Sequence, residues 1–259
     1  MFIDSHCHFD FDVFNEQRDE LIAQCVNQGV LGFLVPATTC MSWTRLQALA
    51  ARYPQWRAAY GLHPYFLRES LLAEIDLLGY QCEAAHAIAV GEIGLDCWLD
   101  SVDMDVQVDF FSRQLLVAKS LGLPVILHAR KSYDLVLKCL RKTEFKNGGI
   151  VHAYNGSLEQ AKRFLDLGFV LGVGGTITYP RAKKAHRILS ALDSSAFVLE
   201  TDSPDMPLNG FQGAINTPLS IPIVAEHVAQ IREETVKQIT EQTYGNLLRV
   251  FPKWHEGLL

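Results

Sequence analysis

Eight short apolar segments recur along the 259-residue chain, and stretches with helical periodicity lie between many of them. Each segment is nearly continuous in apolar character, which is typical of strands that are covered on both faces. Strands that alternate with helices favour parallel pairing. The expected strands are Phe2–Ser5, Leu31–Pro36, Arg57–Gly61, Ala87–Gly91, Pro124–Leu127, Gly149–Val151, Phe169–Gly172 and Ala196–Leu199.

The helical stretches carry apolar residues at helical spacing, and several of them end at a glycine. Ser157 and Gln160 have the spacing of a capping box at the start of one stretch. The expected helices are Glu16–Gln28, Asp105–Leu121, Ser157–Leu167, Arg181–Leu192, Leu219–Ile231 and Glu233–Val250. Eight strand–helix units in a chain of this length predict a (β/α)8 TIM barrel that forms a single domain over 1–259. A doubly wound open sheet is the competing topology.

The composition is that of a folded protein, with 49% hydrophobic residues, 20% charged residues and a net charge of −6. No uncharged apolar run approaches the roughly 20 residues that span a bilayer, and no secretory signal is recognisable. We therefore expect no membrane association. Six scattered cysteines without a Cys-x-x-Cys pair indicate reduced thiols in the cytoplasm. The acidic balance argues against coating nucleic acid non-specifically, but it leaves action at one local site open.

Histidines and acids follow the expected strands at the points where these end. His6 and His8 flank Cys7 after the first strand, where residues two apart point to the same side. In an α/β barrel the carboxyl ends of the strands hold the active site. The complete set of metal-ligand candidates, from five strand ends, is His6, His8, Glu92, His128, His152 and Asp202.

A cluster of this kind needs a partner for its buried charges, and a divalent metal ion supplies one. Imidazole and carboxylate together suit Zn, Mn, Fe or Ni, and carboxylate with water also suits Mg. Six candidates are too many for one four-coordinate ion, so the sequence predicts two ions, with one carboxylate between them and a hydroxide as nucleophile.

Six motifs of this chain resemble those of the TatD family of metal-dependent hydrolases and deoxyribonucleases, over nearly the whole length. They are Asp-Ser-His-Cys-His (4–8), Gly-Leu-His-Pro (61–64), Gly-Glu-Ile-Gly-Leu-Asp (91–96), His-Ala-Arg (128–130), His-Ala-Tyr-Asn-Gly (152–156) and Glu-Thr-Asp-Ser-Pro (200–204). The resemblance implies a TIM barrel, two divalent cations such as Zn, Mg or Mn, and 3′→5′ exonuclease activity on DNA.

The resemblance also implies roles for individual residues. His6, His8, Glu92 and Asp202 would hold one ion. Glu92, His128 and His152 would hold the other ion, with Glu92 as the bridge. His63 would face the substrate phosphate.

The chain departs from the family pattern around the ligands. Lys131 stands where Asp commonly follows the His-x-Arg motif, and Ala-Tyr-Asn-Gly with Tyr154 replaces a common Cys-Phe-Ser-Gly. Ile215 begins Ile-Asn-Thr-Pro in place of Arg-Asn-Glu-Pro. The ligands are retained while their surroundings change, so hydrolysis is expected and the substrate is left open.

Further residues near the strand ends have two interpretations each. Asp202 is a ligand, a general base for the attacking water, or both, and Asp96 is expected to orient a ligand. Arg130 and Lys131 either pair with a phosphate or belong to a solvated loop. Four aromatic residues follow strand ends, and packing within the protein is favoured over stacking on bases for each of them: Tyr65, Trp98, Tyr154 and Tyr179. The basic residues Arg181, Lys183 and Lys184 are expected to form a solvated helix face.

Three functions fit these features. The favoured one is a metal-dependent phosphodiesterase that acts on DNA, with single-stranded ends or another small phosphodiester as substrate, catalytic Glu92 and Asp202, and substrate-binding His63 and Arg130. The alternative is an amide or ester hydrolase, including one that cleaves aminoacyl esters from RNA; Ala87–Asp96 holds no Lys for the carboxylated-lysine bridge of many such enzymes. The third is a non-catalytic metal or nucleic-acid binding module. No obligate protein partner is inferred.

Overall fold

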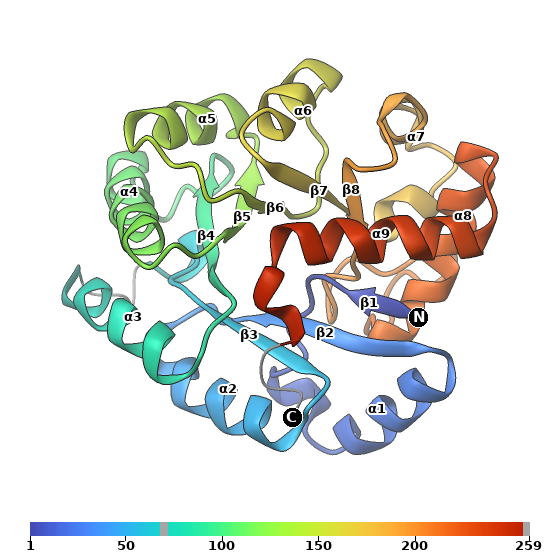
Figure 1. The fold of residues 1–259 in the computed structure, drawn as a ribbon, viewed down its shortest axis with the longest axis horizontal. Helices are drawn as coiled ribbons and strands as arrows, with labels where there is room; N and C mark the ends of the chain where they lie inside the picture. Colours follow the sequence, from blue (N-terminus) through green and yellow to red (C-terminus); the bar gives the residue numbers. More distant parts are fainter. Residues whose placement is uncertain (68–71, 256–259) are drawn as a thin grey trace.

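Eight parallel strands in sequence order form the sheet of the computed structural model, which describes residues 1–67 and 72–255 (Figure 1). Neighbouring strands pair in parallel from the first to the eighth. The strands are β1 (Phe2–Asp4), β2 (Val30–Pro36), β3 (Trp56–Tyr60), β4 (Ala89–Asp96), β5 (Val125–Arg130), β6 (Gly149–Val151), β7 (Phe169–Val173) and β8 (Phe197–Leu199). The predicted barrel is confirmed, and the open sheet is excluded.

The barrel closes between β8 and β1. The backbone N–H of Ser5, just after β1, donates a hydrogen bond of 2.9 Å to the carbonyl of Leu199 in β8. The buried carboxylate of Asp4 accepts from both the backbone N–H and the hydroxyl of Thr201, at 3.0 and 2.6 Å. Burial raises the pKa of Asp4 to about 7, although these hydrogen bonds oppose that rise. The first and last strands are therefore joined where two candidate ligands, His6 and Asp202, begin their loops.

Helices surround the barrel (Figure 1), and none in the described part of the chain is long and apolar enough to cross a membrane. The α-helices are α1 (Arg18–Asn27), α2 (Cys40–Arg52), α3 (Leu72–Ala84), α4 (Met104–Ser120), α5 (Tyr133–Lys142), α6 (Leu158–Leu165), α7 (Lys183–Ala191), α8 (Ile221–Arg232) and α9 (Val236–Val250). The 3-10 helices are η1 (Asp12–Phe14), η2 (Pro64–Phe66), η3 (Gly175–Thr178), η4 (Pro218–Ser220) and η5 (Pro252–His255). The six expected helices form, including the capping box of Ser157 and Gln160.

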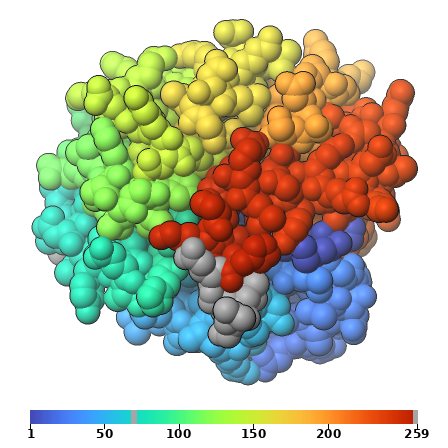
Figure 2. Space-filling view, in the orientation of Figure 1, coloured from blue at the N-terminus to red at the C-terminus, as the bar shows by residue number. Residues whose placement is uncertain are grey.

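An apolar cluster inside the barrel takes one residue from each strand: Ile3, Leu34, Ala59, Ala89, Ile126, Ile150, Val170 and Val198. The same cluster contains Leu247 and Val250 of α9 and Trp254 of η5. In Figure 1, α9 lies across this end of the barrel, and the space-filling view shows the red atoms of the last described residues packed over the same face (Figure 2). One end of the barrel is thus filled with apolar side chains, and the chemistry is confined to the opposite end.

The strand that carries Glu92 differs from its expected form. The apolar pattern predicted an end at Gly91, but β4 continues to Asp96, and its register against β5 shifts between Val90 and Ile93. A Cβ at Gly91 would lie 2.7 Å from the Cβ of Ile126, so glycine allows the close approach of β5 at this point. Glu92 therefore lies within β4, with strand residues before and after it in the chain.

Candidate metal centre

Seven side chains converge at the carboxyl ends of the strands. They are His6 and His8 after β1, His63 after β3, Glu92 in β4, His128 in β5, His152 after β6 and Asp202 after β8. The structure therefore brings together all six predicted metal-ligand candidates and adds His63 to their immediate surroundings. Three overlapping subsets lie within metal-binding reach of one another: His6 with His152 and Asp202, His6 with His8 and Glu92, and His63 with Glu92 and His128.

Glu92 lies at the centre of this arrangement, and its carboxylate is buried. One oxygen, Oε2, faces the two histidines that follow β1. The Nε2 atoms of His6 and His8 lie 3.2 and 3.3 Å from it. Asp202 faces the same two imidazoles, with Oδ1 at 3.4 Å from His6 and 3.8 Å from His8.

The second oxygen of Glu92, Oε1, faces a different set of imidazoles. It lies 3.1 Å from Nδ1 of His128, 3.3 Å from Nε2 of His63 and 3.5 Å from Nε2 of His152. One carboxylate therefore has each of its oxygens directed at a separate group of nitrogen ligands. This is the arrangement expected of a carboxylate that bridges two cations.

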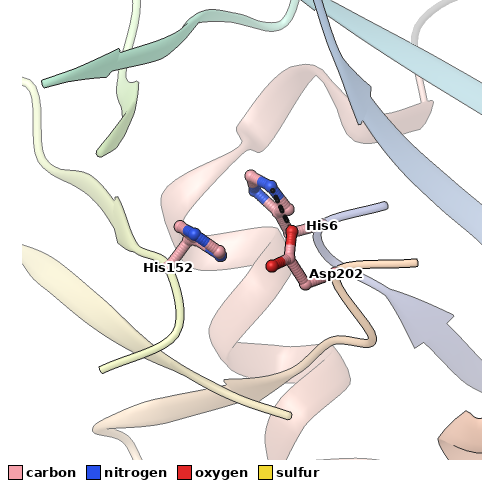
Figure 3. Close-up of side chains that lie close together, drawn as sticks. All are labelled: His6, His152 and Asp202. Carbon is pink, nitrogen blue, oxygen red and sulfur yellow. Dashed lines mark ion pairs between the residues drawn. The ribbon is translucent and has the colours of Figure 1, made fainter. Parts of the chain in front are cut away.

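Asp202 is the carboxylate of this centre that reaches the open side. Its side chain is 16% exposed, whereas that of Glu92 is 1% exposed. Figure 3 shows Asp202 pointing toward the rings of His6 and His152, which come from different strand ends. Its backbone N–H donates to the carbonyl of His6 at 2.9 Å, so the loops after β1 and β8 fix it jointly.

The charges of the centre are strongly coupled. Burial alone would raise the pKa of Glu92, but the surrounding imidazoles outweigh it and hold that pKa well below its usual value. Burial also opposes the ionisation of Asp202, yet His152 and His6 lower its pKa to about 2. The pKa of His128 reaches about 9, because hydrogen bonds to Asp96 and Glu92 outweigh burial. Both carboxylates are thus ionised, and the raised pKa values of His6 and His128 favour compensating positive charge on those two imidazoles.

Unsatisfied buried atoms test whether a cation fits here. Within the described residues, Nδ1 and Nε2 of His6, Oε2 of Glu92 and Nδ1 of His152 have no hydrogen-bond partner. Leaving such atoms buried and unpaired is costly, and a cation between Nε2 of His6 and Oε2 of Glu92 would satisfy both. The mixed nitrogen and oxygen donors also suit Zn, Mn or a similar divalent ion. The residues present therefore fit a bound metal.

The outer ring nitrogens distinguish His63 from the other histidines. In His8, His128 and His152 the nitrogen turned away from Glu92 lies near an oxygen acceptor, which leaves the inward nitrogen free to bind a cation. Nδ1 of His63 instead accepts a hydrogen bond of 3.1 Å from the backbone N–H of Tyr65. The proton of a neutral His63 must then lie on Nε2, and burial lowers its pKa to about 4, so it is neutral at pH 7. His63 is a hydrogen-bond donor in this state.

Two carboxylates outside the ligand set hold these rings. Asp96 accepts from Nε2 of His128 at 3.0 Å and from the backbone N–H of Trp98 at 2.8 Å, which agrees with the orienting role expected for it. Glu200 had no expected role. Its Oε1 accepts from the backbone N–H of Ala153 at 2.6 Å and lies 3.5 Å from Nδ1 of His152.

Glu200 fits only because of two glycines on β7 and its end. A Cβ at Gly172 would lie 2.0 Å from Oε2 of Glu200, and one at Gly174 would lie 3.3 Å from its Cγ. The carboxylate is fully buried in this space, directly behind His152. Glu200 is therefore placed to hold the His152 ring with its free nitrogen toward the centre.

We expect Glu200→Gln to weaken divalent-metal binding about 10- to 100-fold without unfolding the protein. Glutamine can still accept the hydrogen bond from Ala153, but it lacks the negative charge that favours a proton on Nδ1 of His152. Competition with a chelating indicator dye measures the affinity, and circular dichroism checks the fold. Glu159→Gln, at an exposed position of α6, is the matched control. Equal metal affinity in Glu200→Gln and wild type would contradict this role.

A cleft of about 780 Å³ opens beside His128, His152 and Asp202. Arg130 lines it, is half exposed, and lies 3.9 Å from Asp96, so it stands at the rim and not among the ligand candidates. Lys184 lines the same cleft, although it was expected to belong to a solvated helix face. The sequence pattern of α7 is amphipathic, which predicted a solvent-facing position for Lys184. The loop before α7 instead places the first turn of the helix at the barrel mouth.

The four aromatic residues divide into two pairs. Tyr65 and Trp98 are 59% and 60% exposed near the mouth. The hydroxyl groups of Tyr154 and Tyr179 donate to the carbonyls of Ser157 and Pro207, at 2.5 and 2.8 Å. The expectation of packing therefore holds for Tyr154 and Tyr179, whereas Tyr65 and Trp98 remain open to a ligand.

The family model of the TatD related DNase matches residues 3–252. The chain is 40% identical to the uncharacterized metal-dependent hydrolase YjjV of Escherichia coli K12, covering 96% of this chain and 97% of that protein. The crystal structure of YjjV superposes with a TM-score of 0.93, covering 97% and 98% of the two chains. The chain is also 28% identical to the 3′-5′ ssDNA/RNA exonuclease TatD of Klebsiella pneumoniae, covering 92% and 93%.

Proposed function

Because the chain belongs to the family of TatD-related DNases and is a metal-dependent hydrolase, we propose that it removes nucleotides from the 3′ ends of single-stranded DNA. The observation that carries the proposal is the carboxylate of Glu92, whose two oxygens face separate groups of imidazoles beside an open cleft. Two cations held on either side of one carboxylate suit the in-line displacement at a phosphodiester. The exonuclease TatD, a relative by sequence, supports single-stranded nucleic acid as the substrate.

The two sides of Glu92 support the ligand sets that the family resemblance implies. His6, His8, Glu92 and Asp202 would hold one divalent ion, and Glu92, His128 and His152 the other, with Zn, Mg or Mn as candidates. When bound, the ions supply Lewis-acid polarisation of the phosphoryl group. The protein's own residues supply the rest of the chemistry.

Asp202 accepts the proton of the attacking water in this proposal, and its position in the lining of the cleft supports that role. Its position between the loops of β1 and β8 fixes the direction of that oxygen. His63 donates from Nε2 to a non-bridging phosphate oxygen, in place of its present contact with Glu92. Arg130, half exposed at the rim, pairs with the phosphate charge from the cleft side.

A pair of end-labelled oligonucleotides tests this function. With the metal-loaded protein, a 3′-labelled single strand should release its label as a mononucleotide from the first turnover. A 5′-labelled strand of the same sequence should shorten stepwise. The physical reason is that a strand end can enter the cleft, whereas a duplex laid across an acidic protein would need a basic stripe.

Gel analysis of both labels is the measurement, and a covalently closed single-stranded circle is the control substrate without ends. Cleavage of an aminoacyl ester of RNA, with the oligonucleotides left intact, would favour an ester hydrolase. No turnover of either substrate by protein with bound metal would favour a binding module.

A further inference from the structure

Two lysines line the cleft that opens beside the candidate metal centre. Lys131 follows β5 directly, and Lys184 lies in the first turn of α7. Both line the cleft that contains His128 and His152, and both line an adjoining cavity of about 450 Å³. Residues 53 positions apart in the sequence are thus brought to one wall of the substrate cleft.

Within the described part of the chain, neither ammonium group forms an ion pair. Among residues 1–67 and 72–255, no carboxylate lies within 4.0 Å of either one. Asp134 lines the adjoining cavity, but Gln160 and Arg163 engage its two oxygens, each at 2.7 Å. Asp134 therefore does not neutralise the two lysines, and the acids that line the cleft itself, Asp202 and Asp205, lie more than 4.0 Å from both ammonium groups.

Lys184 is held in position by the protein backbone. Its Nζ donates to the carbonyl of Asn155 at 2.8 Å, and the backbone N–H of Asn155 donates to the hydroxyl of Tyr133 at 2.8 Å. An ammonium group has three donors, so further N–H groups of Lys184 are available to a ligand. Burial lowers the pKa of Lys184, and the positive charge of Lys131 lowers it further, as expected of two cations directed at a common space.

Trp98 contacts two cations of this wall, Arg130 and Lys131. The guanidinium of Arg130 lies 4.3 Å from the centre of its indole ring, and the ammonium of Lys131 lies 5.9 Å from it. Such contacts hold cations in place without neutralising them. Arg130, Lys131 and Lys184 therefore form a cationic wall, which begins beside the candidate metal centre and continues away from it.

We propose that Lys131 and Lys184 bind a second, non-scissile phosphate of the substrate, on the 5′ side of the phosphate that is cleaved. This inference rests on the proposed function and narrows its substrate class to strands, or short nucleotides, with a phosphate neighbouring the scissile one. A polyanion with adjacent phosphates matches a cationic wall that extends beyond the reacting centre. A phosphodiester without a second phosphate would make no contact with Lys131 or Lys184.

A minimal pair of substrates tests the proposal: the dinucleoside monophosphate of thymidine, and the same molecule with a 5′-phosphate. Wild type should hydrolyse the phosphorylated form with a kcat/KM about tenfold or more higher, which is the size of a charge-assisted contact. Lys131→Gln and Lys184→Gln should each reduce this preference strongly while leaving kcat/KM for the unphosphorylated form unchanged. Lys183→Gln, the neighbouring exposed lysine of α7 that lines neither cavity, should retain it.

Calorimetric binding of both dinucleotides to wild type and to the two variants separates this proposal from the proposed function. Tighter binding of the phosphorylated form, lost in the variants, supports the lysine site even if neither molecule is hydrolysed. Equal hydrolysis and equal binding of the two molecules by wild type would overturn the lysine site while leaving phosphodiester hydrolysis intact. A preference that persists in both lysine variants would overturn it as well.

Discussion

Glu92→Gln is expected to lower the rate of hydrolysis by on the order of 10³-fold or more while preserving the fold. Glutamine has the same size as glutamate, but it presents one oxygen and one NH₂ group. It can therefore face only one of the two imidazole groups with an acceptor, and it carries no charge to attract a second cation. Each tenfold loss of rate corresponds to about 1.4 kcal/mol at the transition state, so the bridge would supply about 4 kcal/mol.

Steady-state rates at saturating metal measure this effect, with circular dichroism to check the fold. Glu83→Gln, at an exposed position on α3, is the matched control and should retain wild-type turnover. Turnover within a few-fold of wild type in Glu92→Gln would eliminate Glu92 as the shared ligand.

Removal of divalent metal is expected to abolish hydrolysis and to lower the thermal stability. A ligand at 1,000 times its Kd stabilises the folded state by about 4 kcal/mol, which for a protein of this size is roughly 10 °C in Tm. The gain is expected here because the cation would satisfy the buried, unpaired atoms of His6 and Glu92. Dialysis against a chelator, followed by titration with Mn or Zn, should restore both activity and Tm as two ions bind per chain.

Metal content and Tm measured on the same samples provide the check. His6→Ala should lose most of the metal-dependent rise in Tm, whereas His227→Gln, on α8 and outside the centre, should keep it. Anomalous scattering from metal-saturated crystals that shows one ion, with His128 and His152 uncoordinated, would remove the two-ion arrangement.

The strands were predictable because parallel strands buried on both faces have continuous apolar sequences. Phe33, Leu34 and Val35 of β2, for example, are fully buried. The same reasoning placed the end of β4 too early, at Gly91. A glutamate normally marks the edge of a buried strand, but the surrounding imidazoles stabilise the charge of Glu92 and the strand continues past it.

Three α-helices of the described residues, α2, α3 and α5, were not predicted, for different reasons. In α5, Val136, Leu137 and Leu140 are buried at helical spacing, which is the pattern of an amphipathic helix. In α3, Leu77 and Tyr80 are exposed although they are apolar, and this obscures which face packs on the barrel. In α2 the buried face is narrow, since Trp43 and Leu46 are the buried residues of thirteen.

The ligand candidates could be identified from the sequence because each one follows an apolar strand segment, which is a local property. The residues that support them could not be identified in this way. Glu200 meets the backbone of Ala153 across 47 positions, and Lys184 meets that of Asn155 across 29. Contacts of this kind depend on how far each loop reaches at the barrel mouth, which no local pattern records.

The apolar side chains beneath the candidate metal centre close the inner end of the cleft. Side chains from every strand, together with Leu247, Val250 and Trp254, occupy the barrel axis below the ligands. A polymer therefore cannot pass through the barrel, and substrate and product must use the same opening of the cleft. Each released fragment must leave through this opening before the next bond of the substrate can reach the candidate metal centre. Product release at the barrel mouth is therefore expected to limit the rate at which a long substrate is shortened.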